Sequence, residues 1–254
     1  MTKRNQFFVL LAVPLVAALF SFEVHADFLT GTFLFLGVPA LLLSWWSPGH
    51  VRKAALFALT FIPLWIFLDL VIYINQQWYV VSAYSYRLFG LIAWEEIAAI
   101  FLLQYVLVMF WEHFFERKRR ERPWRRRMTY LSAVFIGIFL VGMLLWRWNP
   151  SILHIPYFYF MMMAVFFGIP AVLELIRHPN LGAKFFRTSL YFAYAFLAYD
   201  LTGIALGQWT FPGQYMAWMS IAGVRLPLDD FISWILIGSA ACLAWYEHFD
   251  DDEK

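Results

Sequence analysis

The stretch AALFALTFIPLWIFLDLVIYIN, residues 54–75, contains one acid, Asp69, and no basic residue. At 1.5 Å per residue, a helix over these positions would be about 33 Å long, and the hydrocarbon core of a bilayer is about 30 Å thick. The stretch therefore predicts a transmembrane helix that carries a carboxyl group inside the membrane.

Seven further apolar runs of similar length surround this stretch. They cover approximately residues 6–22, 28–46, 89–114, 128–147, 155–176, 186–207 and 219–246. Of the 254 residues, 63% are hydrophobic and 14% are charged, and the mean hydropathy is +0.65. A soluble domain has about a quarter of its residues charged, so soluble and disordered chains are excluded. The runs do not alternate with a period of two, which excludes a transmembrane β-barrel. The sequence predicts an all-α, polytopic membrane bundle of about eight transmembrane helices.

The basic residues predict the orientation of this bundle. If the spans alternate from the N-terminus, Arg87, Arg147 and Arg225 lie on one side and the other 16 of the 19 Lys and Arg residues lie on the opposite side. Cytoplasmic segments carry the excess of Lys and Arg, so we expect a multi-pass protein of the cell (inner) membrane with both termini cytoplasmic. The basic stretch 116–127 is interpreted as a topology anchor on anionic lipid and not as a nucleic-acid site.

An internal duplication is visible in the spacing of several motifs. Gly37-Val38-Pro39-Ala40-Leu41 recurs 131 residues later as Gly168-Ile169-Pro170-Ala171-Val172. The same spacing relates Lys53 to Lys184, Asp69 to Asp200 and Trp78 to Trp209, and a spacing of 134 relates Glu95-Glu96 to Asp229-Asp230. We predict two parallel four-helix repeats, 1–115 and 128–249, joined by a basic cytoplasmic linker, 116–127, and followed by an acidic tail, 250–254.

Six carboxyl groups fall inside the predicted spans, and they are the candidate catalytic residues: Asp69, Glu95, Glu96, Asp200, Asp229 and Asp230. An ionised side chain at mid-membrane costs at least about 2.5–3.5 kcal/mol, so such acids point to a function. Counted along their helices, all six lie about 9 Å from the outer surface and should converge in one layer. Neighbouring carboxylates in a low dielectric cannot all ionise, so some should keep a proton at neutral pH. The alternative is that they act as polar ties between helices.

Aromatic residues lie close to these acids in the sequence. The candidates for substrate binding are Tyr73, Trp78, Trp94, Tyr199, Trp209 and Phe211. Their ring faces could stabilise a carbocation, although Trp78 and Trp209 could equally be anchors at the membrane interface. The chain has one cysteine, no glycine-rich dinucleotide motif, no phosphate-binding loop and no His-Glu-x-x-His motif, so we expect no cofactor and no metal.

Taken in order, these motifs resemble the integral-membrane lycopene cyclase domain family of carotenoid biosynthesis, in its fused form with the domain present twice. The matching positions in the second half are Pro170, Tyr199-Asp200, Gly207-Gln208-Trp209-Thr210-Phe211, Leu226-Pro227-Leu228-Asp229-Asp230 and Tyr246-Glu247. In the first half they are Pro39, Leu43-Ser44, Asp69, Trp78, Glu95-Glu96 and Glu112. The first half departs from the pattern, because Ala93-Trp94 replaces the family's proline before the acid pair.

The resemblance implies an intramolecular lyase, or isomerase, that needs no flavin. Such an enzyme cyclises the ψ end groups of lycopene to β-ionone-type rings without net redox change. Glu95, Glu96, Asp229 and Asp230 would supply and remove the proton, and Asp69 and Asp200 would orient them or tune their acidity. The expected partners are a lipophilic polyene and membrane lipid, without nucleic acid, and contact with other carotenoid-pathway membrane enzymes would suit this role.

Two other interpretations remain open at this stage. One is a different carotenoid- or isoprenoid-modifying enzyme, such as a hydratase that adds water to the same cation. The other is a small proton-coupled transporter, since parallel repeats with acids inside the membrane also fit a carrier. A carrier should have broken helices at the site and an aqueous path, whereas a cyclase cavity should be lined with aromatic residues.

Overall fold

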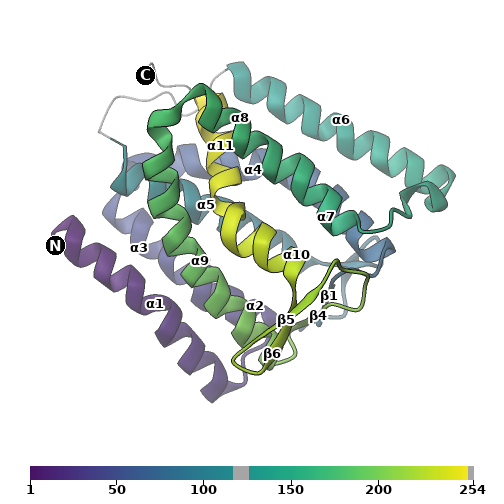
Figure 1. The fold of residues 1–254 in the computed structure, drawn as a ribbon, viewed down its shortest axis with the longest axis horizontal. Coiled ribbons are helices and arrows are strands. Elements are labelled where there is room, and N and C mark those ends of the chain that lie inside the picture. The colour runs from purple at the N-terminus through teal and green to yellow at the C-terminus, as the bar shows by residue number, and fades with distance from the viewer. Residues whose placement is uncertain (117–125, 251–254) are drawn as a thin grey trace.

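The computed structural model describes residues 1–116 and 126–250. The predicted basic linker at 116–127 and acidic tail at 250–254 therefore lie mostly outside the described residues. Within the described ranges the protein is a bundle of helices, with short β-hairpins at one end (Figure 1).

In the described part of the chain, seven helical segments are long and apolar enough to cross a membrane. They are Lys3–Val24, Phe28–Trp46, Pro48–Ile74, Trp94–Phe114, Arg126–Trp148, Phe158–Arg177 and Leu228–Phe249. The remaining predicted span is the 24-residue helix α9 (Gly182–Ala205), which is equally long but richer in tyrosine, threonine and basic residues. The chain is thus an all-α, multi-pass bundle, as its composition predicts.

Several of the spans are divided into shorter segments. The α-helices besides α9 are α1 (Lys3–Val24), α2 (Phe28–Thr32), α3 (Val38–Trp46), α4 (Val51–Ile74), α5 (Trp94–Phe114), α6 (Arg126–Trp148), α7 (Phe158–Met163), α8 (Ile169–Arg177), α10 (Leu228–Asp230) and α11 (Gly238–Asp250). Three π-helical segments continue α2, α7 and α10, respectively: η1 (Phe33–Gly37), η4 (Ala164–Gly168) and η6 (Phe231–Ile237). Short 3₁₀ turns occupy η2 (Pro48–His50), η3 (Pro150–Leu153) and η5 (Pro179–Leu181).

The connections between helices at one end form three antiparallel strand pairs. They are β1 (Tyr79–Val80) with β4 (Trp209–Thr210), β2 (Arg87–Leu88) with β3 (Ile92–Ala93), and β5 (Trp218–Ile221) with β6 (Val224–Pro227). We call this the hairpin end and the opposite end the basic end. The apolar run predicted to begin at 219 becomes helical only at 228, because Ala222 (φ 50°) and Gly223 (φ 82°) form a hairpin turn.

The helices pack in an arrangement that leaves two of them at the margins. α4 packs against α5 and α6, while α9 packs against α1, α11 and η6. α1 and α6 lie at opposite sides of the bundle (Figure 1). They expose large apolar side chains such as Leu19 and Leu144, which are 73% and 70% exposed. Surfaces of this kind face lipid in a membrane protein, since only apolar side chains are stable there.

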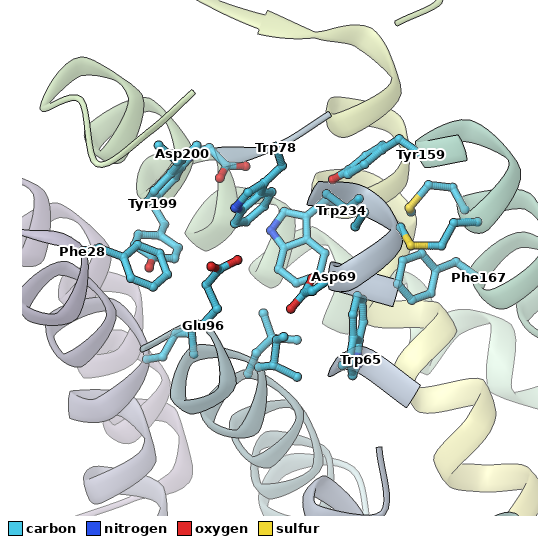
Figure 2. Close-up of a pocket in the computed structure, with 18 residues that line it drawn as sticks. Phe28, Trp65, Asp69, Trp78, Glu96, Tyr159, Phe167, Tyr199, Asp200 and Trp234 are labelled. Atoms are coloured by element: carbon cyan, nitrogen blue, oxygen red, sulfur yellow. The ribbon is translucent and has the colours of Figure 1, made fainter. Parts of the chain in front are cut away.

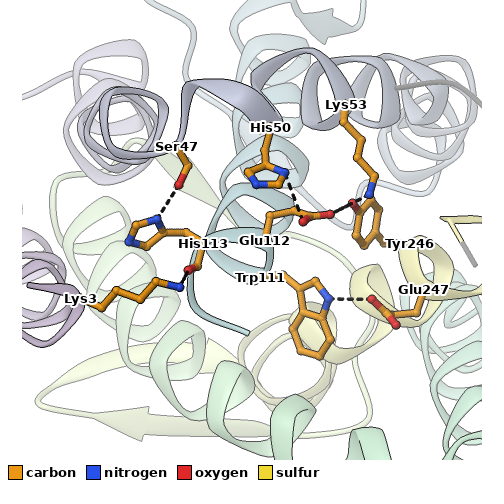
Figure 3. A network of polar contacts seen from close by, with 9 residues as sticks. All are labelled: Lys3, Ser47, His50, Lys53, Trp111, Glu112, His113, Tyr246 and Glu247. Atoms are coloured by element: carbon orange, nitrogen blue, oxygen red, sulfur yellow. Dashed lines mark hydrogen bonds and ion pairs between the residues drawn. The ribbon is translucent and has the colours of Figure 1, made fainter. Parts of the chain in front are cut away.

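A polar cluster at the basic end joins α5 to α11 (Figure 3). Glu112 accepts hydrogen bonds from Lys53 Nζ, at 2.9 Å, and from the Tyr246 hydroxyl, while His50 Nδ1 lies 3.3 Å from its other oxygen. In the reverse direction, Trp111 Nε1 donates to Glu247 at 2.6 Å. Each acid is thus held by an aromatic donor from the other helix, which holds the basic ends of α5 and α11 together.

A second part of this cluster fastens α1 and α3 to the same end of α5. His113 contacts Ser47 Oγ through Nδ1, at 2.6 Å, and Gln6 Oε1 through Nε2, at 3.0 Å. Lys3 donates to the His113 carbonyl oxygen. These contacts hold α1 and α3 to the basic end of α5.

We expect Lys53→Met to lower the free energy of unfolding by about 3–5 kcal/mol, because it removes one partner of a buried ion pair. The side chains of Lys53 and Glu112 are only 7% and 1% exposed. The matched control is Lys184→Met, since Lys184 occupies the corresponding position in the sequence but its pair with Glu116 is 40% and 25% exposed. The control should change the free energy by less than about 1 kcal/mol. Denaturant titration in detergent measures the free energy of unfolding of both variants. Equal losses in Lys53→Met and Lys184→Met would contradict a stabilising role for the buried Lys53–Glu112 pair.

Candidate active site

A cavity lies near the hairpin end, where α4, α5, α7 and α9 approach one another (Figure 2). The cavity is narrow in this structure, with a volume of about 60 Å³. Eight of its 18 lining residues are aromatic: Phe28, Trp65, Trp78, Tyr159, Phe167, Tyr199, Trp209 and Trp234. Three carboxyl groups, those of Asp69, Glu96 and Asp200, also face it. The site therefore combines acids with an apolar chamber.

The three π-helical segments all contribute to the wall. Leu36 of η1, Phe167 of η4 and Trp234 of η6 line the cavity. A π-helical turn contains an extra residue, which shifts side chains relative to a regular α-helix, and such turns are frequent at functional sites. Pro39 and Pro170 are the second residues after η1 and η4, in the first turns of α3 and α8, where a missing N–H is tolerated.

Gly203 on α9 is required for the placement of one aromatic wall. A Cβ atom at this position would lie 2.0 Å from the Trp209 ring. With no side chain there, Trp209 is buried and stacks on Trp78, with ring centroids 6.1 Å apart and an interplanar angle of 9°. The edge of Phe28 meets the same indole at 5.8 Å. These rings form a rigid aromatic wall on one side of the cavity.

Asp69 and Asp200 are the acids with the least polar surroundings. They are 8% and 3% exposed, and each has a buried Oδ2 with no hydrogen-bond partner among the described residues. Figure 2 shows Asp69 directed toward the space beside Trp65 and Trp234. A buried, unpaired carboxylate is very costly, whereas a neutral carboxyl group is far less so. This environment favours the protonated acid.

Glu96 and Asp230 are buried beside Asp69 and Asp200, but each has a tyrosine donor. The Tyr73 hydroxyl donates to Glu96 Oε1 at 2.5 Å, and the Tyr159 hydroxyl donates to Asp230 Oδ1. Glu96 lines the cavity directly, whereas Asp230 is not in the lining and lies behind Tyr159. The two acid pairs, Asp69 with Glu96 and Asp200 with Asp230, are each close enough to interact electrostatically.

Glu95 and Asp229 do not line the cavity, although they belong to the same sequence motifs. Glu95 accepts hydrogen bonds from Ser82 Oγ, at 2.7 and 2.8 Å, and from the Ala83 amide, at 3.0 Å. Asp229 accepts one from the Met216 amide at 2.8 Å. Both acids therefore fasten the loops of the hairpin end. The predicted single layer of six carboxyl groups is in fact split between cavity and loops.

The predicted aromatic residues are distributed in a similar way. Trp78, Tyr199 and Trp209 line the cavity. Tyr73 donates to Glu96 without lining the cavity itself, and Phe211 meets Trp78 in a T-shaped contact with centroids 6.1 Å apart. Trp94 is 37% exposed and packs on Tyr84 at the surface. Of the six predicted aromatic residues, three therefore line the cavity and three lie outside its lining.

Several lining residues were not singled out from the sequence, above all Tyr159, Trp65 and Trp234. Tyr159 could have been found, because the 131-residue spacing matches it to Phe28, which also lines the cavity. Trp65 and Trp234 lie in continuous apolar runs, where position alone does not show which face of a helix meets a cavity.

Just outside the spans, burial and the neighbouring Asp230 and Asp229 raise the pKa of Tyr215, so its hydroxyl stays protonated.

The described residues contain no group of three His, Cys, Asp or Glu side chains arranged to hold a metal ion. The single cysteine, Cys242, is buried and its thiol contacts Gln104 Oε1 at 2.6 Å. The chemistry that these residues can perform themselves is proton transfer between carboxyl groups in an apolar chamber.

We expect Glu95→Ala to release the loop around Ser82 and Ala83 without opening the cavity. The substitution removes the acceptor for two donors, the Ser82 hydroxyl and the Ala83 amide, and a hydrogen bond to a carboxylate is worth roughly 1.5–3 kcal/mol. Hydrogen exchange of the Ala83 amide should then accelerate by at least about 100-fold. Glu96→Gln is the control and should leave this amide protected, and unchanged protection in Glu95→Ala would refute the role of Glu95.

Comparison of the chain with protein-family models, with curated proteins and with solved structures finds no match. The functional assignment therefore rests on the cavity and its acids.

Proposed function

We propose that the protein is a membrane-embedded cyclase that closes the ψ end group of lycopene, or of a closely related linear carotenoid, to a β-type ring by acid catalysis. The observation that carries this proposal is the placement of hydrogen-bond-deficient carboxyl groups, Asp69 and Asp200, on the wall of an aromatic cavity. An alkene is a weak base, so its protonation requires a strong, poorly solvated acid in a chamber without competing water.

The reaction conserves atoms and electrons. A carboxylic acid donates its proton to the terminal double bond of the polyene, which leaves a tertiary carbocation and a carboxylate. The neighbouring double bond attacks this cation, and the new carbon–carbon bond closes a six-membered ring with the charge moved into the ring. A second carboxylate removes a ring proton and regenerates a double bond. One proton is delivered and one is removed, so the product is an isomer of the substrate and no redox partner is consumed.

The geometry supports different roles for the acids from those that the motif alone implies. Asp69 and Asp200 face the cavity without hydrogen-bond donors, so they suit proton donation. Glu96 faces the cavity and accepts two hydrogen bonds, which suits a carboxylate that acts as base. Glu95 and Asp229 are occupied with loop amides and hydroxyls and would act only indirectly.

The aromatic wall supports the same chemistry. Desolvated cation–π contacts are worth about 2 kcal/mol or more, and the indoles of Trp65, Trp78, Trp209 and Trp234 surround the cavity. Buried tryptophans also exclude water, which would otherwise trap the cation as an alcohol. This second effect favours a cyclase over a hydratase acting on the same intermediate.

We also infer that the chain consists of two four-helix repeats that share this one cavity. The starts of η1 and η4, of η2 and η5, and of α4 and α9 are each separated by 131 residues, the spacing of the sequence duplication. β1 pairs with β4 so that Tyr79 opposes Thr210, its own counterpart at that spacing. The positive-inside bias further supports cytoplasmic termini in a cell membrane, with the hairpin end outside.

Expression of the full chain in a bacterial host that accumulates lycopene tests the proposal. We expect the host's lycopene to be converted into pigments with one or two β-rings, separable by chromatography and identical to lycopene in mass. A product heavier by one water would indicate a hydratase instead. Unchanged lycopene, with the protein present in the membrane fraction, would refute the proposal.

Variants in the same host test the assigned roles. Asp200→Asn and Glu96→Gln preserve side-chain size but remove the ionisable proton, so each should reduce cyclised pigment by at least about 100-fold, the usual minimum for a general acid or base. Glu23→Gln, at an exposed position near the end of α1, is the control and should behave like the native chain. Full activity in Asp200→Asn would remove Asp200 from the mechanism.

A further inference from the structure

Glu96 has a backbone hydrogen-bond donor that Asp230, its counterpart in the second half, lacks. The Ala93 amide donates to Glu96 Oε1 at 2.9 Å. A spacing of 134 residues relates Glu95-Glu96 to Asp229-Asp230, and the same spacing relates Ala93 to Pro227. Proline has no N–H. Asp230 therefore cannot receive the equivalent bond, and its Oδ2 is buried without a hydrogen-bond partner among the described residues. Glu96 has two donors to one oxygen where Asp230 has one donor in total.

A cation adds to this difference. Arg87 of β2 is fixed in the hairpin by hydrogen bonds from Nη1 to the Leu91 carbonyl, at 2.7 Å, and from Nη2 to the Val80 carbonyl, at 2.6 Å. Its Nη1 also lies 3.4 Å from the Tyr73 hydroxyl, the group that donates to Glu96. The positive charge of Arg87 thus reaches Glu96 through a polarised tyrosine.

The second half has no such cation beside its acids. Among residues 1–116 and 126–250, no Lys, Arg or His side chain forms a hydrogen bond with Asp200, with Asp230 or with Tyr159, the tyrosine that donates to Asp230. The titratable groups that face them are Tyr159 of α7, Tyr199 of α9, Tyr215 of the loop before β5 and the adjacent Asp229. Arg225, the arginine of the second long hairpin, stacks on the Trp218 ring at 4.5 Å instead.

We propose that the two halves have divided roles, in which Arg87 and the Ala93 amide hold Glu96 as the charged base while the Asp200–Asp230 pair retains both protons and supplies the acid. The division into base and acid rests on the proposed cyclase function, but the difference in charge does not. Arg87 is a positioning residue, because it acts on the cavity only through Tyr73 and Glu96. The groups that face Glu96 are Asp69 and Tyr73 of α4, Arg87 of β2, Glu95 of α5 and Tyr199 of α9.

Infrared difference spectroscopy of the purified full chain at neutral pH tests the charge difference without substrate. The carbonyl band of a protonated carboxyl group is assigned to Asp230 by its loss in Asp230→Asn, and to Glu96 by its loss in Glu96→Gln. We expect the native protein to show the Asp230 band and to lack a Glu96 band. In Arg87→Met a protonated Glu96 band should appear, in Arg87→Lys it should be absent or much weaker, and in the control Arg225→Met the spectrum should match that of the native chain.

A pair of reciprocal variants tests the backbone donor. Ala93 has φ −66° and Pro227 has φ −65°, so Ala93→Pro and Pro227→Ala both fit the existing backbone. Ala93→Pro should make part of Glu96 protonated, and Pro227→Ala should weaken the Asp230 band by offering it an amide. If Arg87→Met fails to fold, the Glu96 band in Ala93→Pro and Tyr73→Phe decides whether Glu96 is held charged, because each of these variants removes one donor to Glu96.

The outcomes separate the two proposals. A native Glu96 band that is present at neutral pH and unchanged by Arg87→Met and Ala93→Pro overturns the division of charge, whatever the protein does to lycopene. If the bands behave as expected but lycopene is unchanged in the host, the charge difference stands and the cyclase function fails. If both hold, Arg87→Met should lower cyclised pigment by about tenfold or more, and Arg87→Lys should recover part of it.

Discussion

The need to bury carboxyl groups in an apolar bundle governs the structure of this protein. The six candidate acids near the hairpin end are at most 8% exposed, and each must either be compensated by donors or stay neutral. Glu95 and Asp229 are compensated by loop amides, Glu96 and Asp230 by tyrosines, and Asp69 and Asp200 have no donor among the described residues. The hairpins of this end therefore also supply the donors that make buried charge tolerable.

The opposite end of the bundle uses the same constraint for assembly. Glu112 and Glu247 are each bonded to an aromatic donor from the other helix, and Lys53 is directed at Glu112. This cluster is dense in donors, and we assign it to structure. Asp69 and Asp200 have no donor among the described residues, and we propose that they take part in the chemistry. The contrast between the two ends is the strongest reason to regard Asp69 and Asp200 as functional and not as ties between helices.

The presence of Ala93 at the position that corresponds to Pro227 in the second half has a specific physical consequence. It adds one amide donor to Glu96, and Arg87 adds a positive charge through Tyr73. A duplicated chain that keeps identical acids in both halves would place equivalent protons on both sides of a shared cavity. Small departures of this kind can instead make one side basic and the other acidic, which a reaction that adds one proton and removes another requires.

Much of the architecture follows directly from the sequence, because membrane spans need long apolar runs and these are visible without tertiary information. The runs predicted the helices to within a few residues, except where hairpins such as the turn at Ala222 and Gly223 delay the helix start. The spacing of Asp69 and Asp200 likewise predicted acids near one end of the bundle. What only the tertiary structure decided is which acid faces the cavity. Adjacent residues on a helix point about 100° apart, so Glu95 and Glu96 reach different surroundings. The contributions of Tyr159 and Arg87 depend on side-chain contacts between segments distant in the sequence, which a linear pattern does not contain.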